Sequence, residues 1–172
     1  FKAFYQHNLL VAAEILDEAM LIPYLSKSDL AECKLEYADI MLLSGKVWTA
    51  ILYYSQVEKS FKENPLGHEA KLRRAKIAYF QGDFEWAQAQ LDVLKASTSK
   101  LIANDAMHLS LLITDNLGLD TSEIPLQIFA RADLLFFQNR FSESIITLDS
   151  VLNIYKGHSL TDEILFKKSE IY

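Results

Sequence analysis

Apolar and polar positions along this chain repeat in four similar segments. In each segment a run of mostly apolar or aromatic residues leads into a short polar turn, and an apolar residue follows the turn. The four segments are 3–9, 41–47, 78–84 and 135–141. Each is followed at a fixed distance by a small residue, then by a bulky residue, then by an apolar or small one. An internal repeat of this kind decides the architecture, and it indicates a series of helix pairs.

The spacing of the repeats predicts one additional helix. The residue after the turn advances by 38 positions from Leu9 to Val47, by 37 from Val47 to Phe84, and by 57 from Phe84 to Phe141. The first two intervals fit one helix–turn–helix unit. The third is too long by roughly one helix.

The small residues have a physical reason. Antiparallel helices approach closely only where a side chain is small, so alanine near the crossing and bulky residues one turn away fit together as knob and hole. We therefore expect the small residues to be buried where the paired helices cross. They are Ala12, Ala50, Ala87 and Ser144.

The turn between paired helices needs a residue with positive φ at the end of the first helix. Glycine supplies this conformation at little steric cost, and asparagine and histidine are among the few other residue types that adopt it. We therefore predict positive φ at or beside His7, Gly45, Gly82 and Asn139.

The pattern predicts antiparallel pairs at 29–44/47–62, 67–81/84–95 and 123–138/141–155. Further helices are expected at about 9–21, 100–117 and from 160 onward. Capping boxes are expected at Asp29/Glu32 and at Asp120/Glu123. The core stripe expected for the extra helix is Leu101, Ala106, Leu109, Leu112 and Ile113.

This pattern resembles the tetratricopeptide repeat (TPR), which has a small residue in helix A, a glycine before helix B, and then alanine and a bulky residue. The resemblance covers most of the chain except about 97–122. The usual Trp and Leu early in helix A are missing, and the period exceeds the 34-residue standard. The best match is Ala75, Ala78, Gly82, Phe84, Ala87, Leu91 and Leu94.

The resemblance implies an all-α fold: a right-handed α-solenoid of antiparallel helix pairs, interrupted by one extra helix. The alternative is a non-repetitive helical bundle. Because the chain starts and stops inside what look like A helices, we expect a fragment of a longer, bacterial TPR protein. The expected units are about 1–25, 28–63, 65–96, 122–156 and 159–172, with the extra helix in 97–119.

The composition of the chain disfavours some kinds of binding partner. The 172 residues are 51% apolar, which is ample for one core, and the net charge of −6 disfavours nucleic acid as the main partner. No apolar run reaches the ~18–20 residues of a membrane span, so none is expected. One basic cluster surrounds a predicted helix, and we interpret it as a solvated face. It consists of Lys71, Arg73, Arg74 and Lys76.

The sequence shows no catalytic or metal-binding pattern. The four histidines are far apart, and none lies in a spaced metal-ligand motif. Cys33 has no nearby base, and Gly82 stands alone instead of forming a phosphate loop. We therefore expect neither enzymatic activity nor a cofactor.

By analogy with TPR folds, the concave face of the A helices forms a groove with apolar, aromatic and acidic side chains. Such a groove suits an extended peptide or an amphipathic helix with apolar anchors and a few basic residues. The alternative is that aromatic residues such as Phe80 pack in the core. The candidate groove residues are Leu35, Asp39, Leu42, Leu72, Lys76, Tyr79, Phe80, Phe129, Asp133 and Phe136.

The resemblance also disfavours one known TPR activity. TPR domains that clamp the C-terminal carboxylate of chaperones use Lys and Asn at set positions of helix A. Two of these positions hold Asp39 and Asp133 here, and their charge would repel a carboxylate.

The function expected from the sequence is a non-catalytic protein–protein interaction scaffold that binds a protein or peptide. One alternative is a regulatory or sensor domain fused to an effector. Another is a structural spacer that self-associates through open repeat ends. The sequence leaves the compartment open between cytoplasm and cell envelope.

Overall fold

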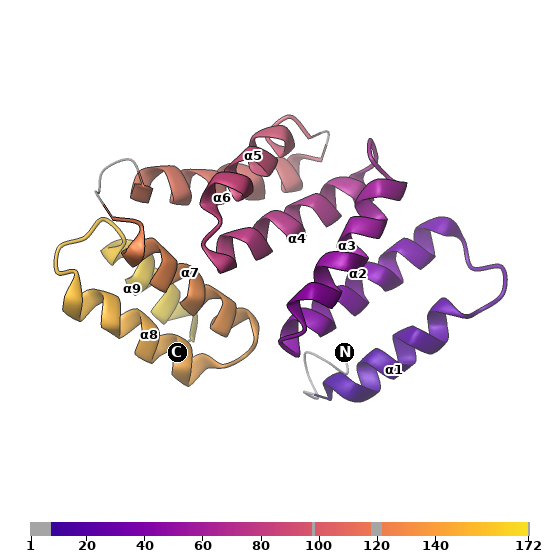
Figure 1. The fold of residues 1–172 in the computed structure, drawn as a ribbon, viewed down its shortest axis with the longest axis horizontal. Helices are drawn as coiled ribbons and strands as arrows, with labels where there is room; N and C mark the ends of the chain where they lie inside the picture. Colours follow the sequence, from indigo (N-terminus) through magenta and orange to yellow (C-terminus); the bar gives the residue numbers. More distant parts are fainter. Residues whose placement is uncertain (1–7, 98, 118–121, 172) are drawn as a thin grey trace.

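The computed structural model describes residues 8–97, 99–117 and 122–171, which form α-helices and no strand (Figure 1). The fold is therefore all-α over the described residues, as predicted. The helices are α1 Leu9–Met20, α2 Lys27–Leu43, α3 Val47–Ser60, α4 Pro65–Gln81, α5 Phe84–Leu94, α6 Lys100–Leu117, α7 Ile124–Phe137, α8 Phe141–Ile154 and α9 Thr161–Ile171.

The three predicted helix pairs are confirmed. Helix α2 packs against α3, α4 against α5, and α7 against α8, and the members of each pair run in opposite directions (Figure 1). The expected small residues Ala50, Ala87 and Ser144 are completely buried. Ser144 also donates a hydrogen bond through its hydroxyl to the carbonyl of Ala132 on the paired helix, at 2.9 Å.

The turns within the pairs have the predicted backbone. The φ angle is +76° at Gly45, +79° at Gly82 and +58° at Asn139. His7 lies outside the described residues. In each turn the next amide donates to the carbonyl five residues earlier, for example Arg140 N–H to Leu135 at 2.9 Å. This is the Schellman closure of a helix.

The helix starts differ from the predicted caps. Helix α2 begins at Lys27, because the hydroxyl of Ser26 accepts the Asp29 amide at 3.1 Å. The capping box predicted at Asp29/Glu32 is therefore wrong. Glu123 makes no side-chain cap for α7, and the Ser122 hydroxyl accepts the Ile124 amide instead. Asp120 lies outside the described residues.

A helix is present where the extra one was predicted, and three residues of its predicted core stripe, Ala106, Leu109 and Ile113, are buried. Leu101 is exposed, and Ile102 takes its place in the core. The buried apolar stripe runs through Ile102, Ala106, Leu109 and Ile113 at the spacing of one helix face. The prediction is wrong only at Leu101. Adjacent positions on a helix point about 100° apart, so Ile102 faces the core and Leu101 faces away from it.

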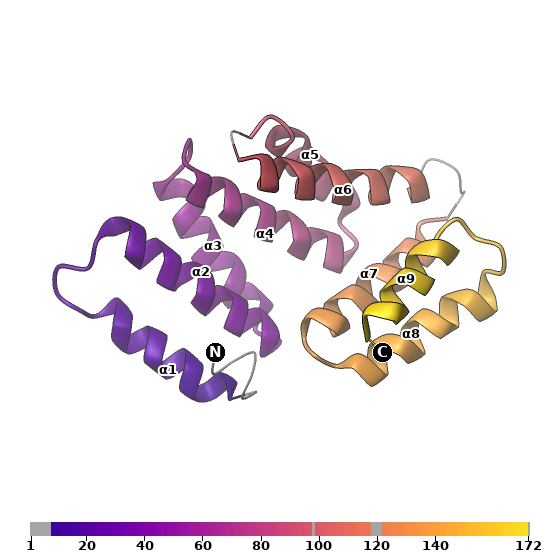
Figure 2. The same ribbon diagram turned by 180° about the vertical axis from the view of Figure 1, so that it is seen from behind.

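Helix α4 is the centre of the molecule. It packs against α3 and α5, and also against α2, α6 and α7. Helix α6 packs on α5 and α4 much as α4 packs on α3 and α2. Figure 2 shows α2, α4 and α6 as neighbours in the nearer layer. The chain then returns, and α7 packs on α4 instead of continuing beyond α6 (Figure 1).

The core has two apolar clusters that share α4. One joins α1, α2 and α3 to Ala70 and Ile77 of α4. The other joins α5 through α9 to Leu72, Ala75 and Tyr79 of α4. Phe80 packs against both clusters. Helix α4 therefore contributes apolar side chains to both clusters.

Candidate functional site

Five of the ten predicted groove residues are buried in the core. They offer no surface to a partner, so the apolar groove predicted from them is corrected to core packing. Leu72, Tyr79 and Phe129 lie in the cluster that joins α5 through α9 to α4, and Leu35 and Leu42 lie in the cluster around α1, α2 and α3. The five are Leu35, Leu42, Leu72, Tyr79 and Phe129.

The two other aromatic candidates are partly buried and packed against neighbouring rings. The Phe80 ring lies 6.4 Å from that of Phe137, centroid to centroid. The Phe136 ring meets Phe141 edge-on at 5.5 Å, and the ammonium of Lys167 lies 4.6 Å from its centroid. These contacts agree with the alternative that such aromatic residues pack internally.

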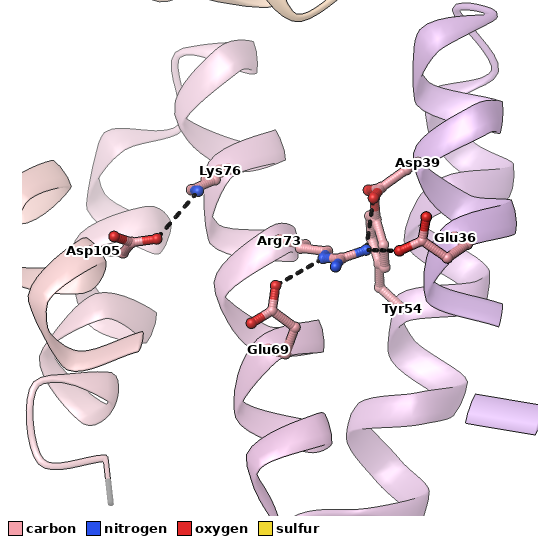
Figure 3. Close-up of polar contacts among 7 residues, drawn as sticks. All are labelled: Glu36, Asp39, Tyr54, Glu69, Arg73, Lys76 and Asp105. Carbon is pink, nitrogen blue, oxygen red and sulfur yellow. Dashed lines mark hydrogen bonds and ion pairs between the residues drawn. The ribbon is translucent and has the colours of Figure 1, made fainter. Parts of the chain in front are cut away.

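The polar candidate Asp39 lies in a network that joins three helices (Figure 3). The Tyr54 hydroxyl on α3 donates to one carboxylate oxygen of Asp39 on α2. The Arg73 guanidinium on α4 donates to the other oxygen at 2.6 Å. Both oxygens of this largely buried carboxylate are therefore satisfied, as a buried charge requires.

Arg73 extends this network toward the surface. It donates at 3.0 Å to Glu69, one turn earlier on α4, and its Nη1 lies 3.8 Å from a carboxylate oxygen of Glu36 on α2. Glu36 is half exposed, and Glu69 is about one-third exposed. Arg73 thus places two accessible carboxylates beside a buried one.

Lys76 continues the polar row on the other side of α4. Its ammonium lies 3.9 Å from a carboxylate oxygen of Asp105 on α6, and both side chains are nearly half exposed. Figure 3 shows Arg73 pointing toward α2 and Lys76 pointing toward Asp105. We call the whole row the charged strip. It consists of Glu36, Asp39, Glu69, Arg73, Lys76 and Asp105.

The charged strip is acidic overall. It holds four carboxylates and two cations, which gives a formal charge of −2 if all are ionised. Of the ten predicted groove residues it includes Asp39 and Lys76. The groove face is therefore a charged surface over α2, α4 and α6, where the sequence had indicated an apolar and aromatic surface with acidic points.

The four basic side chains of α4 are partly exposed and all form ion pairs, so the face that they make is only partly solvated. Lys71 and Arg74 both approach Glu58 on α3. Arg74 also lies over the Trp86 ring, 5.1 Å from its centroid. Together with Arg73 and Lys76, these side chains join α4 to four neighbouring helices, α2, α3, α5 and α6.

Burial raises the pKa of Asp39 to about 6, because loss of solvation outweighs the attraction of Arg73 and the hydrogen bond from Tyr54. Burial also raises the pKa of the Tyr54 hydroxyl, and the neighbouring Asp39 charge adds to this effect. Tyr54 is therefore neutral and a hydrogen-bond donor at physiological pH.

A second carboxylate network lies around the candidate Asp133. The Tyr79 hydroxyl of α4 donates at 2.9 Å to one oxygen of Asp133 on α7. The ammonium of Lys167 on α9 lies 3.4 Å from the other oxygen. The pKa of Asp133 is raised by burial, against the lowering influence of Lys167 and Tyr79.

Sequence reasoning missed the cations of both networks, although a signal was present. Arg73 follows Asp39 by 34 residues, and Lys167 follows Asp133 by the same 34 residues. That distance is the standard TPR period. An acid and a base one period apart lie on successive A-type helices, where they can meet.

Two other classes of site are not found over the described residues. No group of three or more His, Cys, Asp or Glu side chains there is placed to hold a metal ion. None of the helices in the described part of the chain has both the length and the apolar character to cross a membrane.

No family model, curated protein or solved structure matches this chain.

Proposed function

We propose that this chain is a non-catalytic protein–protein interaction scaffold, built as a right-handed, TPR-like α-solenoid in which α6 interrupts the alternation of helices. The helix pairs, the positive φ values in their turns and the buried small residues at their crossings support this architecture. The partner is a protein or peptide, with no role for nucleic acid.

The charged strip is the observation that carries the proposal. Its accessible carboxylates belong to three neighbouring helices and are held by Arg73 and Lys76. Ordered groups lose little conformational entropy on binding, so such a surface favours recognition. Because the strip is acidic, a complementary segment carries lysine or arginine beside its anchors.

Peptide selection tests the proposal. A displayed peptide library is selected against the whole chain, and dissociation constants of the selected peptides are measured by fluorescence anisotropy. Glu36→Lys reverses a half-exposed charge of the strip. We expect it to raise the dissociation constant about 5-fold, because an exposed ion pair contributes roughly that much to the free energy of binding.

Glu18→Lys is the matched control, because Glu18 is an exposed acid on α1 outside the strip. The control is expected to bind as the wild type does. Equal losses in both variants would indicate attraction to net charge alone and would contradict a site on the strip.

Self-association is a second candidate function, and one observation favours it. On α9, Leu165 is 54% exposed and Phe166 is 66% exposed. Large apolar side chains that are exposed on one helix favour contact with a partner surface. Light scattering of the wild type at rising concentration would detect the dimer, and Phe166→Glu is expected to abolish it. A strict monomer at all concentrations would exclude this function.

A further inference from the structure

The loop between α1 and α2 exposes an unbroken run of apolar residues. Residues 20–25 are all apolar, and 21–24 are all exposed. Leu21 is 82% exposed, Ile22 is 55% exposed and Tyr24 is fully exposed. We call residues 21–24 the apolar loop, and both ribbon views place it at one end of the molecule (Figure 1, Figure 2). A surface run of this length is a liability for a protein unless it has a function.

Tyr24 adopts a backbone conformation that tyrosine disfavours. Its φ is +69°, and among the described residues Asn139 is the only other non-glycine residue with positive φ. Positive φ is a steric outlier for a bulky residue, whereas glycine adopts it freely. Glycine fills the other such positions, Gly45, Gly82 and Gly157. At position 24 the chain therefore keeps a side chain that its local backbone opposes.

The side chain of Tyr24 does not contribute to the fold. It is as exposed as it would be in an extended chain, and its hydroxyl forms no hydrogen bond with any described residue. Packing therefore does not explain a tyrosine at this position. Tyrosine combines a large apolar ring with one polar group, and it is among the residues that contribute most to the affinity of protein interfaces.

The backbone of the apolar loop is ordered before any partner binds. The Leu21 amide donates to the carbonyl of Glu18 at 3.1 Å, and the Ile22 amide donates to the carbonyl of Ala19 at 3.2 Å. Pro23 fixes its own φ angle through its ring. Because an ordered loop loses little conformational entropy on binding, this arrangement favours recognition.

The helix ends beside the apolar loop are acidic. Between positions 14 and 32 the charged side chains are five acids and one lysine, all exposed, which gives a formal charge of −4. Glu18, Asp29 and Glu32 form no ion pair with any described residue. Unpaired acids attract lysine and arginine on a partner. They oppose contact with an anionic lipid surface, which attracts basic residues, and with the same acidic loop of a second copy.

We infer that the apolar loop inserts into an apolar pocket of a protein partner, and that lysine or arginine side chains border this pocket. The inference rests on the proposed scaffold function and names a surface apart from the charged strip. Tyr24 is the anchor, and Leu21 and Ile22 add apolar area to the contact. The acids on the neighbouring helix ends select the charge of the partner.

Photocrosslinking identifies the partner. The whole chain, with p-benzoylphenylalanine at position 24, is irradiated in a lysate of its source cells, and the crosslinked protein is then purified. The control chain carries the same group at position 48, because Trp48 is 78% exposed on α3. We expect a protein that is crosslinked from position 24 alone. Failure to crosslink any protein, or equal crosslinking from both positions, would overturn the inference.

The dissociation constant of the purified partner tests the role of Tyr24. Tyr24→Gly removes the ring and suits the backbone, so it is expected to weaken binding at least about 10-fold while raising the urea midpoint of unfolding. A merely structural role for Tyr24 would lower that midpoint. Trp48→Ala is the matched control and is expected to change binding less than 2-fold. Unchanged binding by Tyr24→Gly would overturn the inference.

The charge argument has its own test, which also separates the apolar loop from the charged strip. Glu18→Lys is expected to weaken the binding of this partner about 5-fold, whereas peptides on the strip are expected to bind it as they bind the wild type. A partner that binds Glu18→Lys as tightly as the wild type would overturn the basic border of the pocket.

The remaining outcomes distinguish this inference from the proposed function and from other occupants. Binding that falls with Glu36→Lys but not with Tyr24→Gly would support the scaffold on the charged strip and overturn the site on the loop. Cosedimentation with phosphatidylcholine vesicles that Tyr24→Gly abolishes would overturn the protein partner in favour of a lipid surface. A dimer in light scattering that Tyr24→Gly dissociates would overturn it in favour of a second copy.

Discussion

Asp39 and Asp133 occupy equivalent positions, each six residues before the residue with positive φ that ends the turn. Each meets a tyrosine hydroxyl and a cation that follows 34 residues later. The Asp39 network joins α2, α3 and α4, which are consecutive in the chain. The Asp133 network joins α7 to α4 and α9, and its tyrosine lies 54 residues before the carboxylate.

The two carboxylates also differ in how well they are satisfied. Both oxygens of Asp39 accept a hydrogen bond. Asp133 has one hydrogen bond, and over the described residues its other oxygen has only the ion pair with Lys167 at 3.4 Å. The same pairing of an acid with a cation 34 residues later thus gives a tight contact between α2 and α4 and a looser one between α7 and α9. Replacements in the two networks should therefore have different costs.

The largest expected effect is that of removing the cations. Arg73→Met leaves the buried Asp39 with Tyr54 as its remaining partner, and the expected loss of unfolding free energy is about 3–4 kcal/mol. Lys167→Met is expected to cost about 1–2 kcal/mol, because the longer contact to Asp133 stabilises less. Urea unfolding at low salt measures both.

The double variant Asp39→Asn, Arg73→Met is the control for the first replacement. It removes both charges and is expected to recover most of the lost stability. Equal costs for Arg73→Met and Lys167→Met would contradict the difference drawn between the two networks.

The next effect is the pH dependence of the free energy of unfolding. The contribution of Asp39 has the opposite sign to that of the carboxylates that cause ordinary acid denaturation. The pKa of Asp39 is raised from 3.8 to about 6, so between these values the folded chain holds a proton that the unfolded chain releases. The contribution of Asp39 therefore favours folding below about pH 4 and is lost as the pH rises through 6. The full loss is about 3 kcal/mol.

The difference in unfolding free energy between wild type and Asp39→Asn, measured from pH 4 to pH 7, isolates this contribution. It should decline across the window. Burial raises the pKa of Asp133 as well, so Asp133→Asn should show the same sign. A difference that rises with pH would show that the ion pair with Arg73 outweighs burial.

A smaller effect is expected from the tyrosine hydroxyls. Tyr79→Phe removes the single hydrogen bond of Asp133 and is expected to cost about 2 kcal/mol, whereas Tyr54→Phe leaves Arg73 on Asp39 and should cost about 1 kcal/mol. Thermal and urea unfolding measure the two values. A larger cost for Tyr54→Phe would reverse the order of the two networks.

The smallest effect is expected at the rim of the first network. Glu36 is half exposed and lies 3.8 Å from Arg73, so Glu36→Gln should change stability by less than about 0.5 kcal/mol. Unfolding in urea with and without added salt measures it. A cost comparable to that of Arg73→Met would place Glu36 inside the stabilising core of the network.

The candidate surface was only partly predictable. Asp39 and Lys76 were found from their positions in helix A, and both belong to the charged strip. Leu72 and Tyr79 were expected in an open groove because, in an uninterrupted array, nothing packs there. Both residues instead lie in the cluster that joins α5 through α9 to α4, and no local pattern signals that α7 returns onto α4.

The sequence by itself determined the helix pairs, the residues at their crossings and the positive φ values at Gly45, Gly82 and Asn139. The turns depend on backbone sterics and the crossings on small side chains between helices adjacent in the chain, and a short repeated pattern records both. Only the tertiary structure decided that α7 lies on α4 and that the apolar loop stays exposed. Those outcomes depend on the fit between surfaces far apart in the chain, where packing energies that no periodicity encodes choose one arrangement.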